Sequence, residues 1–147
     1  MSITLAQAIR NSIAAEQAAE KFYLRLAARC PDKKGRTVIT GIAAEERLHA
    51  EALEAAAGRL VAGQLPERAD LLVLDIESAP AGDSHEALSL EEALYIAMDA
   101  EHSAMLYYDA LASTTSGEVA TFFEHMGLEE EAHAAAIRAL LTEMGSG

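Results

Sequence analysis

Apolar residues recur in steps of three and four along four long stretches of the chain, which is the spacing of one face of an α-helix. Each of these stripes also contains a glutamate, and two of them contain a histidine three residues after it. Because such a stripe faces the inside of a helical bundle, these charged residues are expected in the core. The stripes are Leu5, Ile9, Ser12, Glu16, Ala19, Tyr23 and Leu26; Ile39, Ile42, Glu46, His49, Leu53, Ala56 and Leu60; Leu90, Leu94, Ala97, Glu101, Ala104, Tyr108 and Leu111; and Phe123, Met126, Glu130, His133, Ile137, Leu140 and Met144.

Capping signals mark where the predicted helices begin and end. The sequences TLAQ and SLEE are capping-box patterns, which start helices just after Thr4 and Ser89. Residues 30–32 (CPD) end the first helix and can cap the second, and residues 113–116 (STTS) separate the third from the fourth. The connection at about residues 61–88, which contains LLVLDI, is too long for a turn and must cross over or along the bundle.

The two predicted hairpins are repeats of each other. A shift of 85 residues places Glu16 on Glu101. After a one-residue gap in the loop, Glu46 and His49 fall on Glu130 and His133. Alanine and glutamate are abundant while valine and isoleucine are sparse, which favours helix over sheet. The sequence therefore predicts an all-α protein, with residues 1–147 forming one four-helix bundle domain of two repeated hairpins.

Composition narrows the partners and the setting. The formal net charge of −13 and the isoelectric point near 4.7 argue against nucleic-acid or anionic-membrane partners and favour cations. The single cysteine, Cys30, cannot form a disulfide within the chain, which fits a reducing compartment. The first residues, MSITLAQAIR, lack the apolar run of a signal peptide, and no apolar stretch approaches the length of a membrane span. We expect a soluble, cytoplasmic protein.

Four glutamates in a core require compensation. Each unpaired buried carboxylate costs several kcal/mol, against a whole-domain stability of roughly 5 to 15 kcal/mol. Two protonated histidines would leave about two negative charges unbalanced, so some carboxyl groups would also have to keep their protons. Two divalent ions would balance all four carboxylates and leave both imidazoles neutral, the form that binds metal. One glutamate on each of two helices, with Glu-x-x-His on the other two, is the ligand set of di-iron and di-manganese bundles.

These motifs resemble the ferritin-like superfamily, and within it the rubrerythrin-type di-iron proteins. The resemblance covers about 110 of the 147 residues. It lies in AAEQAAEKFYLRLA with IAAEERLHAEAL, and in AMDAEHSAMLYYDALA with MGLEEEAHAAAI. It implies a ferritin-like bundle holding two iron ions, although manganese or zinc could occupy the same ligands. The implied residues are the terminal ligands Glu16 and Glu101, the bridging ligands Glu46 and Glu130, the imidazole ligands His49 and His133, and the supporting tyrosines Tyr23 and Tyr108.

The resemblance also implies a function, with two departures. Rubrerythrins carry a further glutamate one turn after the third-helix ligand, where this sequence has Ala104, and a four-cysteine rubredoxin module, where this chain has one cysteine. We expect a redox enzyme that reduces hydrogen peroxide or dioxygen and takes electrons from a separate donor protein. The alternatives are a ferroxidase or iron-storage protein, and a non-catalytic bundle whose site is vestigial.

Several residues outside the stripes carry plainer expectations. Glu45, Glu129 and Glu131 are assigned to a solvated face, and His125 to the surface. Apolar residues outside the stripes predict self-association, most plausibly a homodimer, because monomers rarely leave large apolar patches bare. Those residues are Ile13, Phe22, Leu24 and Leu106, together with LLVLDI in the crossover.

Overall fold

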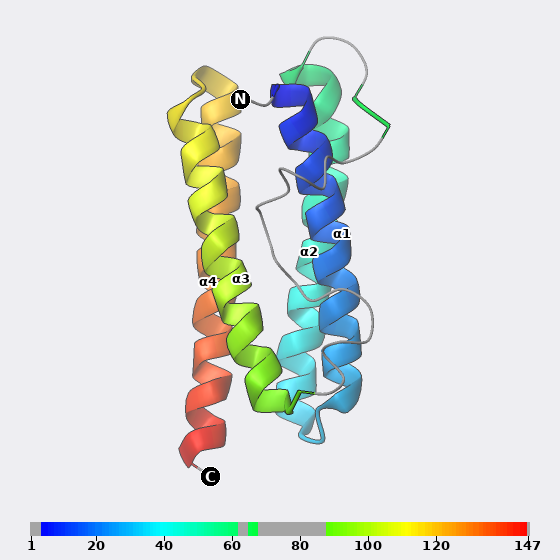
Figure 1. Cartoon of the computed structure of the whole chain (residues 1–147), viewed down its shortest axis with the longest axis vertical. Coiled ribbons are helices and arrows are strands. Elements are labelled where there is room, and N and C mark those ends of the chain that lie inside the picture. The colour runs from blue at the N-terminus through cyan, green and yellow to red at the C-terminus, as the bar shows by residue number, and fades with distance from the viewer. Residues whose placement is uncertain (1–3, 62–64, 68–87, 147) are drawn as a thin grey trace.

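The computed structural model describes residues 4–61, 65–67 and 88–146 (Figure 1). Four long helices run along the same axis: α1 (Leu5–Arg29), α2 (Lys33–Leu60), α3 (Leu90–Ser113) and α4 (Gly117–Ser146). The helices α1 and α2 form one antiparallel hairpin, and α3 and α4 form the other beside it. The all-α prediction is confirmed. The apolar segment LLVLDI of the crossover lies outside the described residues.

The helix ends follow the capping signals. Thr4 accepts a hydrogen bond from the backbone N–H of Gln7 at 3.1 Å, and the Asp32 carboxylate accepts one from Gly35 N–H at 2.9 Å. Ser89 forms a full capping box, because its hydroxyl accepts from the N–H of Glu92 and the Glu92 carboxylate accepts from the N–H of Ser89. Each of these side chains satisfies an N–H group that a helix start would otherwise leave open.

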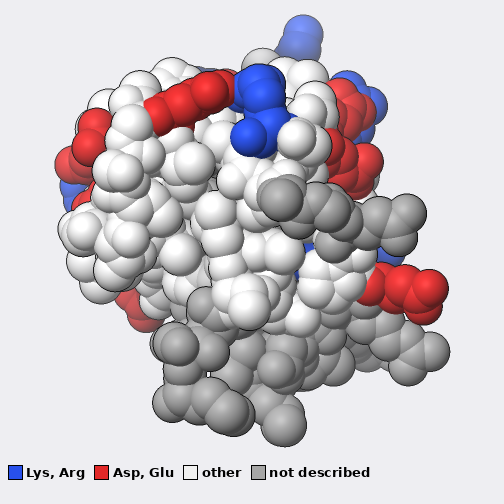
Figure 2. Space-filling model, turned by 90° about the horizontal axis from the view of Figure 1, so that it is seen from above, with Lys and Arg blue, Asp and Glu red and all other residues white. Residues whose placement is uncertain are grey.

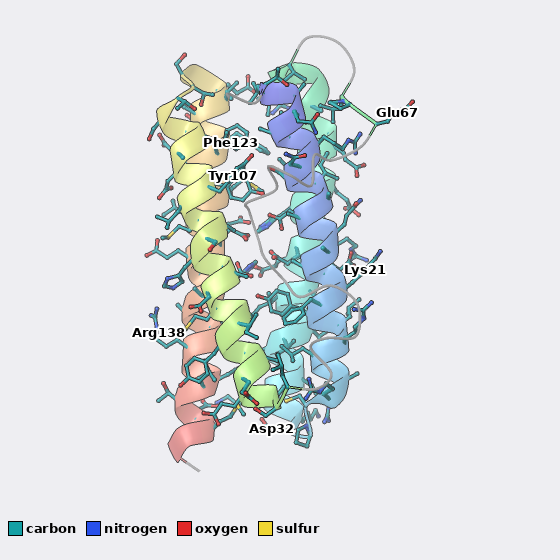
Figure 3. The ribbon with its side chains drawn as sticks, viewed as in Figure 1. Lys21, Asp32, Glu67, Tyr107, Phe123 and Arg138 are labelled. Carbon is teal, nitrogen blue, oxygen red and sulfur yellow. The ribbon has the colours of Figure 1, made fainter. Side chains whose placement is uncertain are left out.

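The stripes predicted from the sequence face the interior. Nearly every stripe residue in the described helices is buried, and Leu5, Leu90 and Leu111 are partly so. Met144 is the exception, since it lies 40% exposed near the end of α4, where the bundle no longer covers it. Residues off the stripes, such as Lys21 and Arg138, project from the outer flanks of the hairpins (Figure 3).

The buried side chains form two apolar clusters rather than one. The first includes Leu26, Ile39 and Ile137, and the second includes Ile13 and Phe123. Neither cluster contains the four stripe glutamates or the two stripe histidines, which are buried as polar groups in the middle of all four helices. The polar layer therefore has apolar packing on both sides, which restricts water access and lowers the local dielectric.

Two residues cited for self-association are part of this packing. Ile13 and Phe22 are 1% and 2% exposed, and both belong to the clusters within the chain. Their extra apolar surface is covered by neighbouring helices, so they give no support to a dimer. Leu24 and Leu106 do remain exposed, at 48% and 63%. None of the four described helices has the length and apolar content that a membrane crossing would require.

Candidate metal centre

Six acidic and imidazole side chains meet at the centre of the bundle. Glu16, Glu46, Glu101 and Glu130 are fully buried, and His49 and His133 are 5% and 3% exposed. One comes from α1, two from α2, one from α3 and two from α4. All six candidate ligands predicted from the sequence are thus brought into one layer.

The six side chains form two overlapping groups of four ligands. One group consists of Glu16, Glu46, His49 and Glu130. The other consists of Glu46, Glu101, Glu130 and His133. Within each group, one ligand atom per residue lies within 4.8 Å of every other. Both groups share Glu46 and Glu130, so these two carboxylates lie between the two candidate cation positions.

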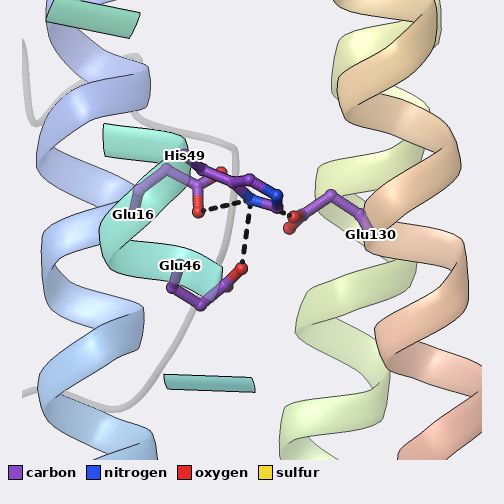
Figure 4. Close-up of side chains that lie close together, drawn as sticks. All are labelled: Glu16, Glu46, His49 and Glu130. Atoms are coloured by element: carbon purple, nitrogen blue, oxygen red, sulfur yellow. Dashed lines mark ion pairs between the residues drawn. The ribbon is translucent and has the colours of Figure 1, made fainter. Parts of the chain in front are cut away.

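Distances around the imidazoles agree with this sharing. The Nδ1 atom of His49 lies 3.1 Å from Glu130 Oε1, 3.3 Å from Glu46 Oε1 and 3.5 Å from Glu16 Oε2 (Figure 4). The Nδ1 atom of His133 lies 3.1 Å from Glu46 Oε1 and 3.6 Å from Glu101 Oε2. Each imidazole therefore points Nδ1 at the carboxylates, and the two rings stack with their centroids 5.5 Å apart.

The donor set fits divalent cations. Within the described part of the chain, four buried atoms lie at ion-pair distance from one another or from the shared carboxylates but take part in no hydrogen bond: His49 Nδ1, His133 Nδ1, Glu16 Oε2 and Glu101 Oε2. Buried polar atoms normally have partners, and leaving one without any costs on the order of 1 to 3 kcal/mol. These atoms all point into the shared layer, where metal ions would supply the missing interactions. Carboxylate and imidazole ligands suit iron, manganese and zinc alike, so they do not choose the ion.

The tyrosines support the glutamates across the bundle. Tyr23 on α1 donates its hydroxyl hydrogen to Glu101 Oε1 at 2.7 Å, and Tyr108 on α3 donates to Glu16 Oε1 at 2.9 Å. Each tyrosine thus holds the glutamate of the opposite hairpin rather than the one on its own helix. The bond occupies Oε1 and leaves Oε2 directed at the centre. These two hydrogen bonds between the hairpins position the carboxylates of Glu16 and Glu101 before any ion binds.

Two further glutamates contact the outer nitrogens of the histidines. Glu45 Oε2 lies 2.6 Å from His133 Nε2, and Glu129 Oε2 contacts His49 Nε2. Their assignment to a solvated face was incomplete, because both side chains are partly exposed but reach across between α2 and α4. A carboxylate at Nε2 favours the tautomer with its proton there, which leaves Nδ1 free to bind metal. The sequence carried a signal for them, since each directly precedes a glutamate that both ligand groups share.

Several other acidic and imidazole residues of the described helices stay outside the centre. Glu20 is half-buried and belongs to neither group of ligands, and Glu131, His102 and His125 are exposed. Ala104, at the position where rubrerythrins carry a further glutamate, is fully buried and offers no ligand atom.

Burial and crowding change the acidity of the centre. Burial, with a further contribution from the charge of Glu46, raises the pKa of Glu16 to about 8, and the same two causes raise the pKa of Glu101. Burial alone would lower the pKa of His133, but the nearby carboxylates of Glu101 and Glu46 outweigh it and raise that pKa to about 12. In the same way, three carboxylates outweigh burial and raise the pKa of His49. Without cations, the imidazoles therefore hold protons as counter-ions.

Comparison with known proteins agrees with this geometry. The Rubrerythrin family model matches residues 92–147, a stretch that contains Glu101, Glu130 and His133. The resemblance to rubrerythrins is confirmed. This rubrerythrin-like chain has no match among curated proteins.

A solved structure shows the same fold. The chain resembles the crystal structure of an uncharacterized conserved protein from Magnetospirillum magnetotacticum MS-1, with a TM-score of 0.71 and 24% identity. The likeness covers 96% of this chain and 95% of that one. The ferritin-like four-helix bundle predicted from the sequence is confirmed, and the buried layer of glutamates and histidines within it is compatible with a di-iron site.

Proposed function

We propose that this rubrerythrin-like chain is a di-iron redox protein that reduces hydrogen peroxide or dioxygen at the Glu/His centre. The observation that carries the proposal is the pair of buried ligand groups that share Glu46 and Glu130. Glu16 and His49 complete one group, and Glu101 and His133 complete the other. A cluster that served only as buried ion pairs would not require two carboxylates that belong to both of two nearly equivalent ligand groups.

The residues would perform distinct tasks in such a reaction. If these residues hold two ferrous ions, the ions would supply the two electrons that, with two protons, convert one hydrogen peroxide molecule to two waters. Glu46 and Glu130 would each contact both ions, and Tyr23 and Tyr108 keep the carboxylates of Glu101 and Glu16 turned inward. Apolar packing above and below the layer limits the access of water along the bundle axis, which strengthens the charge interactions within it.

The proposal is tested by loading the protein with ferrous iron without oxygen and titrating it with peroxide. We expect two irons per chain and complete oxidation at one peroxide per iron pair. Repeated turnover should be slow until a separate electron-donor protein is added. The reason is that the one cysteine in this sequence cannot form the four-cysteine iron site that would otherwise deliver electrons.

Three other outcomes would count against parts of this proposal. Retention of many irons per chain during continued addition of iron and oxygen would indicate iron storage instead. Rapid multiple turnover with a reduced nicotinamide cofactor and no added protein would contradict the need for a donor protein. A metal-free protein after iron loading would show that the centre is vestigial.

A further inference from the structure

A pocket of about 450 Å³ lies between α2 and α4, beside one end of the candidate metal centre. Apolar side chains from both helices form much of its wall, and four polar side chains line it: Glu45, His49, His125 and Glu129. Because His49 is one of the six candidate ligands, this pocket reaches the centre from outside.

Contacts between three of these side chains run from the surface to the interior. His125 Nε2 lies 2.9 Å from Glu129 Oε1, while the other oxygen of Glu129 contacts Nε2 of His49. The exposed fraction of the side chain falls along this series, from 70% for His125 to 38% for Glu129 and 6% for His49. Imidazole and carboxylate groups, which bind divalent cations, therefore occur at each depth between solvent and the centre.

The equivalent series in the other half of the repeat is incomplete. Glu45 contacts Nε2 of His133 just as Glu129 contacts His49. The offset of 84 residues that relates these pairs places Gly41 at the position of His125, so the outer imidazole is missing there. A Cβ atom at Gly41 would meet no atom within 4 Å, so the position has room for a side chain.

We propose that His125 and Glu129 form an outer site that captures a divalent cation from solvent and passes it to the buried centre through the α2/α4 pocket. The net charge of −13 draws cations to the molecule, but only ligands at the pocket mouth can replace the water that a cation loses on the way in. Glu129 carries out the transfer because it contacts both the exposed and the buried imidazole. This inference rests on the metal centre of the proposed function, but not on its redox reaction.

The test measures uptake of Co²⁺ by the full-length apoprotein, followed by the visible absorption of the bound ion after rapid mixing. His125→Ala should slow uptake on the order of tenfold, the lower end of the range for electrostatic steering. Two ions per chain should still bind at equilibrium. Release to an excess of chelator should slow by the same factor, because a residue on the route changes both directions equally and leaves the affinity unchanged. The matched control is His102→Ala, since His102 is an exposed histidine on α3 that does not line the pocket.

A second variant adds the missing outer ligand. Gly41→His places an imidazole four residues before Glu45, as His125 stands four residues before Glu129. It should speed uptake in the native chain and restore it in the His125→Ala background, whereas Gly41→Ala should do neither. Native uptake rates in His125→Ala, or slower uptake with weaker final binding, would overturn the outer site. Failure of the unaltered protein to bind Co²⁺ at all would overturn the metal centre itself, a result distinct from either.

Discussion

Glu46 and Glu130 each lie close to both histidines. Glu46 Oε1 is 3.3 Å from Nδ1 of His49 and 3.1 Å from Nδ1 of His133, and the corresponding distances for Glu130 Oε1 are 3.1 Å and 3.8 Å. A single carboxylate that approaches both imidazoles can serve two cations at once. In this respect Glu46 and Glu130 differ from Glu16 and Glu101, each of which belongs to only one ligand group.

The first prediction concerns these shared carboxylates. Glu46→Ala or Glu130→Ala should remove both metal ions, because each substitution deletes a ligand from both groups. Metal analysis of the purified, iron-loaded variants provides the measurement. Glu131→Ala is the matched control, since Glu131 is exposed and belongs to neither ligand group, and it should keep two ions per chain. Loss of only one ion from either shared-carboxylate variant would contradict bridging.

The second prediction concerns the carboxylates behind the histidines. Glu45→Ala and Glu129→Ala should each weaken metal binding by roughly 10- to 100-fold, the usual effect of removing a carboxylate that orients a ligand histidine. Competition against a chelator of known affinity measures this change. Glu51→Ala, at an exposed position on α2, should leave affinity unchanged. Native affinity in both variants would show that Glu45 and Glu129 do not orient the ligands.

The sequence could predict which candidate ligands meet in the core, but not all of the residues that contact them. The repeat and the stripe periodicity identified Glu16, Glu46 and their equivalents because a ligand must lie on the inward face of its helix. Glu45 and Glu129 lie one residue off that face, and their role depends on α2 and α4 approaching each other closely enough for each to reach the other's histidine. Tyr23 was predicted to support a ligand, but its choice of Glu101 depends equally on how the hairpins are placed.

At the scale of the helices, two glycines in α2 differ in whether packing requires them, although glycine lowers helix propensity at both positions. Gly41 is exposed in the middle of α2, and an added Cβ would meet nothing within 4 Å. Gly35 lies in the first turn of the same helix, and a Cβ there would come within 2.7 Å of the Sγ atom of buried Cys30. The first glycine is therefore dispensable for packing, while the second allows the α1–α2 turn to close tightly.

The third prediction compares these two positions. Gly41→Ala should stabilise the apoprotein by about 0.5 to 1 kcal/mol, because alanine loses less backbone freedom on entering a helix. Gly35→Ala should destabilise it, because the new methyl group overlaps the buried thiol. Chemical denaturation of both variants gives the two free energies of unfolding. The same sign of change at both positions would show that packing at Cys30 does not determine the outcome.

The helix ends were the most predictable elements of the fold. Thr4, Asp32 and Ser89 cap their helices through contacts three residues away, so the information is local in the sequence. The exposure of Met144, near the last turn of α4, was less predictable. Met144 continues the stripe of α4, yet it is exposed because burial depends on whether other helices extend as far, which periodicity alone does not show.

At the scale of the whole molecule, the chain is acidic, and the exposed large apolar side chains among the described residues are Leu24, Leu48, Tyr95, Leu106, Leu128 and Met144. A view along the bundle axis shows acidic side chains at several points around one end of the molecule (Figure 2). Leu24 and Leu106 are exposed on different hairpins, whereas Ile13 and Phe22 are buried. The homodimer thus stays a prediction with a narrower basis, and light scattering at micromolar protein concentration tests it. A sharp monomer mass would contradict it.

The buried charges make the stability of the whole bundle depend on pH. In the apoprotein, the pKa of Glu16 is raised to about 8 and that of Glu101 is also raised, above an unfolded value of about 4.3. Carboxyl groups of this kind contribute stability below the unfolded pKa and lose it as pH rises through the folded pKa. The raised pKa values of His49 and His133 act in the same direction, because their contribution is complete below about 6.5 and declines at higher pH.

The last prediction follows from these signs. The apoprotein should lose stability from pH 5 to pH 8, because over this range the unfolded chain releases protons that the buried carboxyl groups and imidazoles retain in the folded protein. Metal binding requires ionised carboxylates and imidazoles without a proton on Nδ1, so the stabilisation it adds should grow over the same range. Thermal melts of apo and iron-loaded protein measured from pH 5 to pH 8 should therefore diverge as pH rises. Melting curves that shift together across the range would mean that the six buried residues hold protons rather than metal, and that the centre is an ion-pair cluster.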